Sequence, residues 1–496
     1  MSSLSDTLRR AVASLLRDWR DEAREASWGQ ELMAAITVAS MSVPQGVAYA
    51  LIAGLPPAVG LVAGGIPAIV GSMFRSSRHV VSGPTNALSL LVGTSVAAQF
   101  DDPVVASATL AVLVGLLQMA ASVLRLGAVV DYVSAAVVTG YITGAGILIG
   151  AGQLANVTGT PGVRGDLLTQ LSNWVSTLGD THLPTLTLAL ATIALILGLR
   201  QVVSKSAAAL VAVSLGVVAA VGFGLGDHGV RLIRDLASIS QGLPPLQLPD
   251  VTLVGSLVPI ALAGVLLSLV ESTSVARSIA GRTGQQLDLG LEFFGMGLAN
   301  LASGLFGSFP VSGSLSRSAI NEQSGAKTRY AGALSGVLIL VVLLGLGPLV
   351  DLMPIASLAG LLVVVAADLV DVRRIRRLLR ATVSDRFAFL GTLVGTWVLP
   401  LDQAIAVGVG VNVILFLRQA QSLLVRELIV DEEAMRLREV ELSEVPEGQC
   451  RAIRILHLEG PLFFGAAGAL EKAVRPILAD DRARFLVVRL KRTRGL

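Results

Sequence analysis

The sequence predicts an all-α protein that crosses a membrane many times and ends in a small α/β segment. Of its 496 residues, 53% are hydrophobic and only 15% are charged, whereas about a quarter are charged in ordinary soluble domains. The charged residues gather toward the two ends of the chain. Because a spanning helix needs roughly 20 apolar residues, the stretch 29–420 has room for twelve to fourteen spans with short loops.

The composition also excludes several functions. A net charge of +3 supplies no strong basic field, so nucleic acid is not an expected partner. A single cysteine excludes a disulfide framework, and with only four histidines a metal site is not expected. The sequence contains no evident catalytic Ser/His/Asp set or phosphate-binding loop, so we expect neither an enzyme nor a cofactor.

The first segment, residues 1–28, lacks the apolar region and cleavage site of a signal peptide. It predicts a cytoplasmic amphipathic helix at the membrane surface, with a soluble cap helix as the alternative. One helical stripe carries its apolar side chains, namely Leu4, Leu8, Val12, Leu15 and Trp19.

The middle segment contains long apolar runs separated by short polar loops. The clearest runs are Val104–Leu124, Leu183–Leu199, Ala207–Leu225, Leu253–Val270, Gly332–Val350, Leu358–Ala367 and Phe387–Leu399. With fourteen spans, loops on the N-terminal side carry most of the basic residues, including the arginine run at 373–380, while opposite loops carry only Arg164, Arg231 and Arg234. The positive-inside rule then makes both termini cytoplasmic. We interpret the arginine run as a solvated loop, with lipid-headgroup binding as the alternative.

Two interrupted segments recur about half the membrane region apart. Val81-Ser82-Gly83 precedes Pro84–Ala87, and Val311-Ser312-Gly313 precedes Ser314–Arg317. If seven spans separate the two copies, the second is inverted, which predicts a seven-plus-seven inverted repeat with broken helices at its centre.

The broken helices predict an anion site. Each begins near the middle of the membrane, where its N-terminus presents free N–H groups and a partial positive charge. An anion is the ligand that such termini favour. Arg317 lies in the first turn of the second half-helix, and a buried arginine needs an anion, a carboxylate or water. A packing kink without a ligand is the alternative.

Several motifs in order resemble the SulP sulfate-permease family of anion transporters. The opening signature is carried by Pro44–Ala50, Ala53–Pro57, Gly60-Leu61, Ser77–His79 and Gly83-Pro84. The second-half signature is carried by Glu271-Ser272, Ala276-Arg277, Phe309-Pro310 and Ser314–Ser318. The resemblance covers nearly the whole membrane region.

The resemblance implies the fourteen-span fold shared with uracil permeases. A core domain of spans 1–4 and 8–11 would carry the substrate past a gate domain of spans 5–7 and 12–14. It implies a secondary transporter of sulfate, dicarboxylate or bicarbonate in the inner membrane of a bacterium, usually a homodimer, moving by an elevator-like motion. Carried over by position, the anion site comprises Gln45, Tyr49, Thr85, Asn86, Ala87, Ser314, Leu315, Ser316 and Arg317.

Glu271 is the residue we expect to couple transport to an ion. It ends the apolar run of span 8, where an unpaired carboxylate is expensive. The family's sodium-linked bicarbonate transporters resemble this chain but carry an aspartate at the position, so the glutamate favours protons over sodium. A structural ion pair with Arg317 and a hydrogen bond to the Ser272–Ser274 cluster remain alternatives.

The C-terminal segment, residues 431–496, has a different composition. Cys450–Leu458 and Phe485–Leu490 alternate like strands, and Ala466–Leu478 has a helical pattern. The run resembles the start of the STAS domain that follows SulP membrane regions, in a truncated form. An uncoupled anion channel or an anion-bound sensor is the alternative function for the whole chain, and a nucleobase permease of the same fold would place a carboxylate where Arg317 stands.

Overall fold

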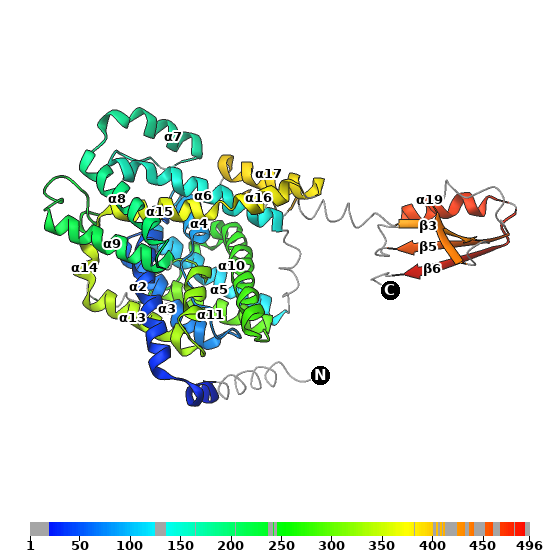
Figure 1. Ribbon diagram of the computed structural model, residues 1–496, viewed down its shortest axis with the longest axis horizontal. Coiled ribbons are helices and arrows are strands. Elements are labelled where there is room, and N and C mark those ends of the chain that lie inside the picture. The colour runs from blue at the N-terminus through cyan, green and yellow to red at the C-terminus, as the bar shows by residue number, and fades with distance from the viewer. Residues whose placement is uncertain are drawn as a thin grey trace. The chain divides into compact units, whose positions relative to one another are not determined.

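The computed structural model describes two separate units, Met1–Val409 and Gly410–Leu496 (Figure 1). The described residues are 19–124, 135–236 without 164 and 204, 242, 246–399 without 381, and 403–411 in part. In the second unit they are 424–431, 436–440, 452–459 and 467–491 without 481. Residues 4–18 of the predicted amphipathic stripe lie outside this set, whereas residues 19–25 are helical.

The first unit is a bundle of helices (Figure 1). Its longer members are α2 (Trp28–Ile52), α3 (Pro57–Phe74), α5 (Pro103–Val123), α6 (Ala135–Thr158), α8 (Leu183–Leu199), α9 (Lys205–Gly222), α10 (Val254–Thr283), α11 (Leu289–Leu305), α13 (Tyr330–Gly345), α15 (Ile355–Leu369) and α17 (Val383–Val398). Short helices are α7 (Leu167–Ser176), α14 (Gly347–Asp351) and α16 (Val372–Leu379). Six helices of the described part are long and apolar enough to cross a membrane.

The helices pack closely because glycines face one another across their contacts. A Cβ on Gly46 of α2 would lie 2.7 Å from the carbonyl oxygen of Gly60 on α3, and a Cβ on Gly297 of α11 would lie 2.8 Å from that of Gly115 on α5. Small residues let membrane helices approach to backbone contact, where van der Waals packing replaces the missing hydrophobic drive. The glycines at these two contacts thus serve helix packing.

Two helices of the bundle are short and begin after an extended stretch. The strand β1 (Ser82–Gly83) precedes α4 (Asn86–Ser95), and β2 (Ser312–Gly313) precedes α12 (Leu315–Gln323). The strands pair antiparallel, with Ser82 opposite Gly313 and Gly83 opposite Ser312. Because the paired strands run in opposite directions, α4 and α12 leave the pair in opposite directions and both N-termini flank it.

Side chains from neighbouring helices satisfy the extended backbone of the second break. The Asn300 side chain accepts a hydrogen bond from the Val311 N–H at 2.7 Å and donates one to the Val311 carbonyl at 3.1 Å. Ser268 donates to the same carbonyl at 2.9 Å, and Ser303 donates to the Phe309 carbonyl at 2.7 Å. Non-helical backbone survives inside a membrane only when protein supplies such partners.

The second unit contains a four-stranded sheet in the order β4-β3-β5-β6. Its strands are β3 (Leu424–Asp431), β4 (Arg436–Val440), β5 (Ile453–Glu459) and β6 (Phe485–Lys491), and α19 (Ala467–Leu478) lies across one face. The parallel pair β5 and β6, joined through α19, is the predicted strand–helix–strand run. The sequence patterns did not predict β3 and β4, which pair antiparallel with each other and join the sheet through β5.

The Gly46–Gly60 contact makes a testable prediction. We expect Gly60→Leu to destabilise the protein by about 3 kcal/mol or more, because a side chain there meets the Gly46 carbonyl and overpacks a rigid contact. Thermal unfolding in detergent measures the effect. Gly29→Ala is the control, since no atom lies within 4 Å of a Cβ at Gly29, and it should change stability by less than about 1 kcal/mol. Equal unfolding temperatures for both variants would contradict the role of this contact.

Candidate functional site

The candidate site lies where α4 and α12 begin. Beside the β1–β2 pair, the Ser314 N–H donates to the Val81 carbonyl at 3.0 Å, and the Ser318 hydroxyl accepts from the Val81 N–H at 3.0 Å. Thr85 and Ser314 occupy the N-cap positions of α4 and α12 without a capping side-chain hydrogen bond. The first N–H groups of both helices therefore keep their positive potential at one location.

Arg317 lies at the centre of this arrangement. Its side chain is fully buried, and its guanidinium group rests against the backbone of Gly83, where any Cβ would overlap Nη1. Nη2 lies 3.5 Å from the Pro84 carbonyl oxygen, while Nε and Nη1 have no hydrogen-bond partner. Within the described residues no acidic side chain forms an ion pair with Arg317. A buried guanidinium group with two unpartnered nitrogens is chemically suited to an anionic acceptor.

Glu271 faces the same place from α10. Its Oε2 accepts a hydrogen bond from the Thr85 hydroxyl at 3.0 Å, and the Ser312 hydroxyl also contacts the carboxylate. The helix α10 continues to Thr283, so Glu271 lies well inside a helix and not at its end. No ion pair joins Glu271 to Arg317, and its hydroxyl partners are Thr85 and Ser312 instead of the Ser272–Ser274 cluster. Glu271 thus connects α10 to the N-cap of α4 and to β2.

The predicted site residues of α2 and α4 contribute further polar groups. Tyr49 is buried and lies within electrostatic reach of both Arg317 and Glu271. Gln45 and Asn86 each have a buried side-chain oxygen without a partner. The Ala87 carbonyl accepts a hydrogen bond from the Tyr141 hydroxyl at 3.1 Å, which adds α6 to the surroundings.

The first turn of α12 presents its residues to different sides. Ser314 is buried, and its hydroxyl lies 3.3 Å from that of Ser316. Ser316 is exposed, and Leu315 is 59% exposed, in contrast to the fully buried Arg317. Arg317 and Ser314 are therefore buried, whereas Leu315 and Ser316 are exposed.

A buried ion pair that the sequence patterns did not predict lies next to the site. Arg75, which follows α3, is fully buried, and its Nε lies 3.2 Å from Oε2 of the buried Glu292 on α11. Nη1 donates to the Ser82 hydroxyl at 3.1 Å, and Nη2 donates to the Ser272 hydroxyl. Ser82 lies in β1 and Ser272 follows Glu271 on α10. The guanidinium group of Arg75 therefore holds β1 and this turn of α10 together. In the sequence Arg75 resembles an ordinary basic loop residue, so no local signal indicated the pair.

These contacts define a membrane-embedded protein with an electropositive site between two broken helices. The site offers two helix N-termini, one unpaired guanidinium group and several hydroxyl and amide groups, which together suit a small anion. A sequence model of the sulfate permease family matches residues 29–392. The chain therefore belongs to the sulfate permease family.

Named relatives agree with this assignment. The chain is 29% identical over 395 residues to a probable sulfate transporter of Mycobacterium tuberculosis, with 78% of this chain and 70% of the relative covered. It is 30% identical over 418 residues to human solute carrier family 26 member 6, with 79% of this chain and 55% of the relative covered.

Solved structures share the fold. A structure of SLC26A9 matches with a TM-score of 0.87 at 20% identity and covers 99% of this chain and 84% of that chain. The transmembrane domain of the cyanobacterial bicarbonate transporter BicA matches with a TM-score of 0.66 at 24% identity and covers 78% of this chain and 96% of that chain.

The Arg75–Glu292 pair can be tested by a double-mutant cycle. We expect Arg75→Met or Glu292→Met alone to destabilise the protein by about 3–5 kcal/mol, because each leaves one buried charge without its partner. The double variant should recover most of that loss. Thermal unfolding of the four proteins in detergent gives the coupling free energy. Losses that simply add would show that the two charges do not depend on each other.

Proposed function

We propose that this protein is a secondary transporter that carries a small oxyanion of the sulfate, dicarboxylate or bicarbonate class. The observation that supports the proposal most directly is Arg317, a fully buried guanidinium group with two unpartnered nitrogens beside the N-termini of α4 and α12. A relative 29% identical to this chain is named a probable sulfate transporter, and one structural neighbour is the transmembrane domain of a bicarbonate transporter.

In this mechanism the anion binds in place of a counter-ion. Its oxygens accept from Arg317 and from the N–H groups at the start of α4 and α12, so binding neutralises a buried charge. Tyr49, Gln45 and Asn86 complete the site and orient the anion through hydrogen bonds. The donors are held by closely packed helices, so they cannot move apart to accept a large anion, and a small one is favoured.

We further propose that the anion moves by alternating access. Fourteen spans in two inverted repeats of seven would form a core of spans 1–4 and 8–11, which carries the site past a gate of spans 5–7 and 12–14. Antiparallel pairing of β1 with β2 supports this view, since two inverted copies bring their breaks together in opposite directions. The protein would work as a homodimer in the bacterial inner membrane with both termini in the cytoplasm.

Glu271 supplies the coupling in this proposal. Its carboxylate lies beside the N-cap of α4, so its charge acts directly on the anion site. Protonation removes a negative charge that would otherwise repel the anion, which makes proton-coupled uptake favourable. Sodium is the second candidate, because the carboxylate and the hydroxyls of Thr85 and Ser312 are hard oxygen ligands.

Substitution of Arg317 tests the anion site. We expect Arg317→Ala to weaken sulfate binding about 10- to 100-fold, because charged hydrogen bonds contribute roughly 1.5–3 kcal/mol each. Uptake of labelled sulfate into proteoliposomes, with bicarbonate and a dicarboxylate as parallel substrates, measures the effect. Arg234→Ala is the control, since Arg234 is a half-exposed arginine whose ion pair is with its neighbour Asp235. Normal uptake of all three anions by Arg317→Ala would remove the basis of the proposal.

Substitution of Glu271 tests the coupling. We expect Glu271→Gln to retain anion binding and exchange, because the amide keeps the size and one hydrogen-bonding oxygen. Uptake driven by an imposed proton gradient should fall to the level seen without a gradient. The same proteoliposomes with an imposed sodium gradient distinguish the two ions. If Glu271→Gln still responds to the proton gradient as the wild type does, Glu271 does not carry the coupling.

A further inference from the structure

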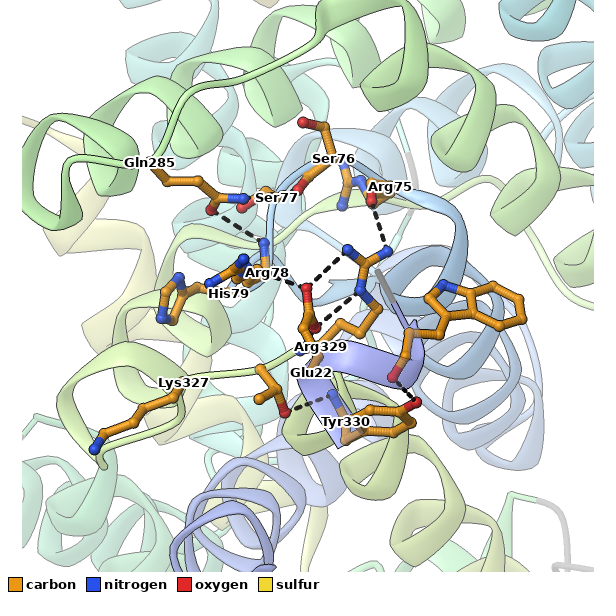
Figure 2. A network of polar contacts seen from close by, with 12 residues as sticks. Glu22, Arg75, Ser76, Ser77, Arg78, His79, Gln285, Lys327, Arg329 and Tyr330 are labelled. Carbon is orange, nitrogen blue, oxygen red and sulfur yellow. Dashed lines mark hydrogen bonds and ion pairs between the residues drawn. The ribbon is translucent and has the colours of Figure 1, made fainter. Parts of the chain in front are cut away.

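A second group of cations surrounds the carboxylate of Glu22, which belongs to the helical segment 19–25 (Figure 2). Glu22 is only 3% exposed. Its Oε1 lies 2.9 Å from Nη2 of Arg329 and 3.1 Å from Nε of Arg78, while its Oε2 accepts from Nε of Arg329 at 3.0 Å and from the Arg329 N–H at 3.1 Å. The carboxylate is bound as a free oxyanion would be, by a two-pronged guanidinium group, a backbone donor and a second cation.

The loop before α13 is built to receive negative charge. The N–H groups of Lys327 and Thr328 both donate to Oε1 of Glu31, at 3.0 and 3.2 Å, and the next N–H in the chain, that of Arg329, donates to Glu22. Three successive N–H groups thus point toward carboxylates at a helix N-terminus. Such an array of backbone donors makes an anion-binding concavity.

The guanidinium group of Arg329 is held in place without Glu22. Its Nη1 donates to the carbonyl oxygens of Met73 and Arg75, at 3.2 and 3.3 Å. Nε and Nη2 therefore keep their direction if the carboxylate leaves. Because the Arg329 side chain is only 4% exposed, its charge then needs another anion.

Space for such an anion exists beside Glu22. A cavity of 510 Å³ is lined by the polar residues Arg75, Arg78, His79, Gln285 and Arg329 together with Glu22. Figure 2 shows Gln285 reaching toward Arg78 at one side of this group. One of the lining residues is Arg75, and its guanidinium group binds Ser82 and Ser272 beside the proposed transport site.

The carboxylate reaches this place on a short, separately held piece of chain. The Trp19 indole N–H donates to the Met73 carbonyl at 2.7 Å, its ring packs edge-on against Phe74, and its own carbonyl accepts from the Tyr330 hydroxyl at 2.8 Å. These few contacts connect the segment to α3 and α13. These contacts belong to the segment and are separate from the packing of α3 against α13.

We propose that Arg329, Arg78 and the Arg329 N–H form a second oxyanion site, which Glu22 occupies as a tethered ligand and which a free oxyanion fills when Glu22 withdraws. The site lies outside the proposed transport site, and Arg75, which binds Ser82 and Ser272, is among the residues that line its cavity. The N-terminal segment thus competes with free oxyanion at this cavity.

Equilibrium binding of labelled sulfate to the full-length protein in detergent, at low ionic strength, tests the proposal. We expect wild-type protein to bind one sulfate per chain, Arg317→Ala to bind it about 10- to 100-fold more weakly, Glu22→Ala to bind two, and Glu22→Ala with Arg317→Ala to bind one with the affinity of the added site. Glu25→Ala is the matched control, because Glu25 lies on the same segment but is exposed, and it should add no sulfate. Thermal unfolding confirms that each variant is folded and should show sulfate raising the unfolding temperature of Glu22→Ala more than that of Glu25→Ala.

The two proposals fail separately in this design. If Arg317→Ala still binds one sulfate with the wild-type affinity, the transport site is misassigned, whereas the second site is judged by the added sulfate that Glu22→Ala alone produces. If folded Glu22→Ala adds no sulfate over its parent in either background, the second site does not exist. Should Glu22→Ala not fold, Glu22→Gln keeps the side-chain volume and removes the charge, and absence of added sulfate in that variant overturns the proposal equally.

Discussion

The structure depends on one constraint, which is that an interrupted backbone inside a membrane must find all of its hydrogen-bond partners within the protein. Pairing of β1 with β2 meets part of this need, and side chains such as Asn300 and Ser268 meet the rest. The constraint explains why polar residues occur deep within apolar helices. It also brings two helix N-termini together, because the two breaks can satisfy each other only when they are adjacent.

Those adjacent N-termini determine the chemistry of the site. Positive potential is already concentrated there, so a buried arginine would be unfavourable unless an anion accompanies it. Gly83 leaves the space that the guanidinium group of Arg317 occupies. Glu271 accepts a hydrogen bond from Thr85, the N-cap residue of α4. Arg317 and Glu271 thus form no ion pair with each other, and the Glu271 carboxylate binds the Thr85 hydroxyl instead.

Sequence reasoning found the parts of this site that local patterns encode. A helix start such as Thr85-Asn86 or Ser314-Leu315 has a recognisable composition, and both α4 and α12 begin there. The pairs Arg75–Glu292 and Glu22–Arg329 join residues more than 200 positions apart, and each residue alone is indistinguishable from a loop charge. The strands β3 and β4 have mixed charged and apolar residues whose alternation becomes evident only beside β5.

Arg75 shows why such long-range pairs matter for function. A buried ion pair adds little net stability, because the cost of removing both charges from water offsets their attraction. Its value here is geometric. The planar guanidinium group directs Nη1 to Ser82 and Nη2 to Ser272, so β1 and the α10 turn that carries Glu271 are held at a fixed separation. Arg75 is also among the residues that line the cavity beside Glu22, so one residue belongs to both regions.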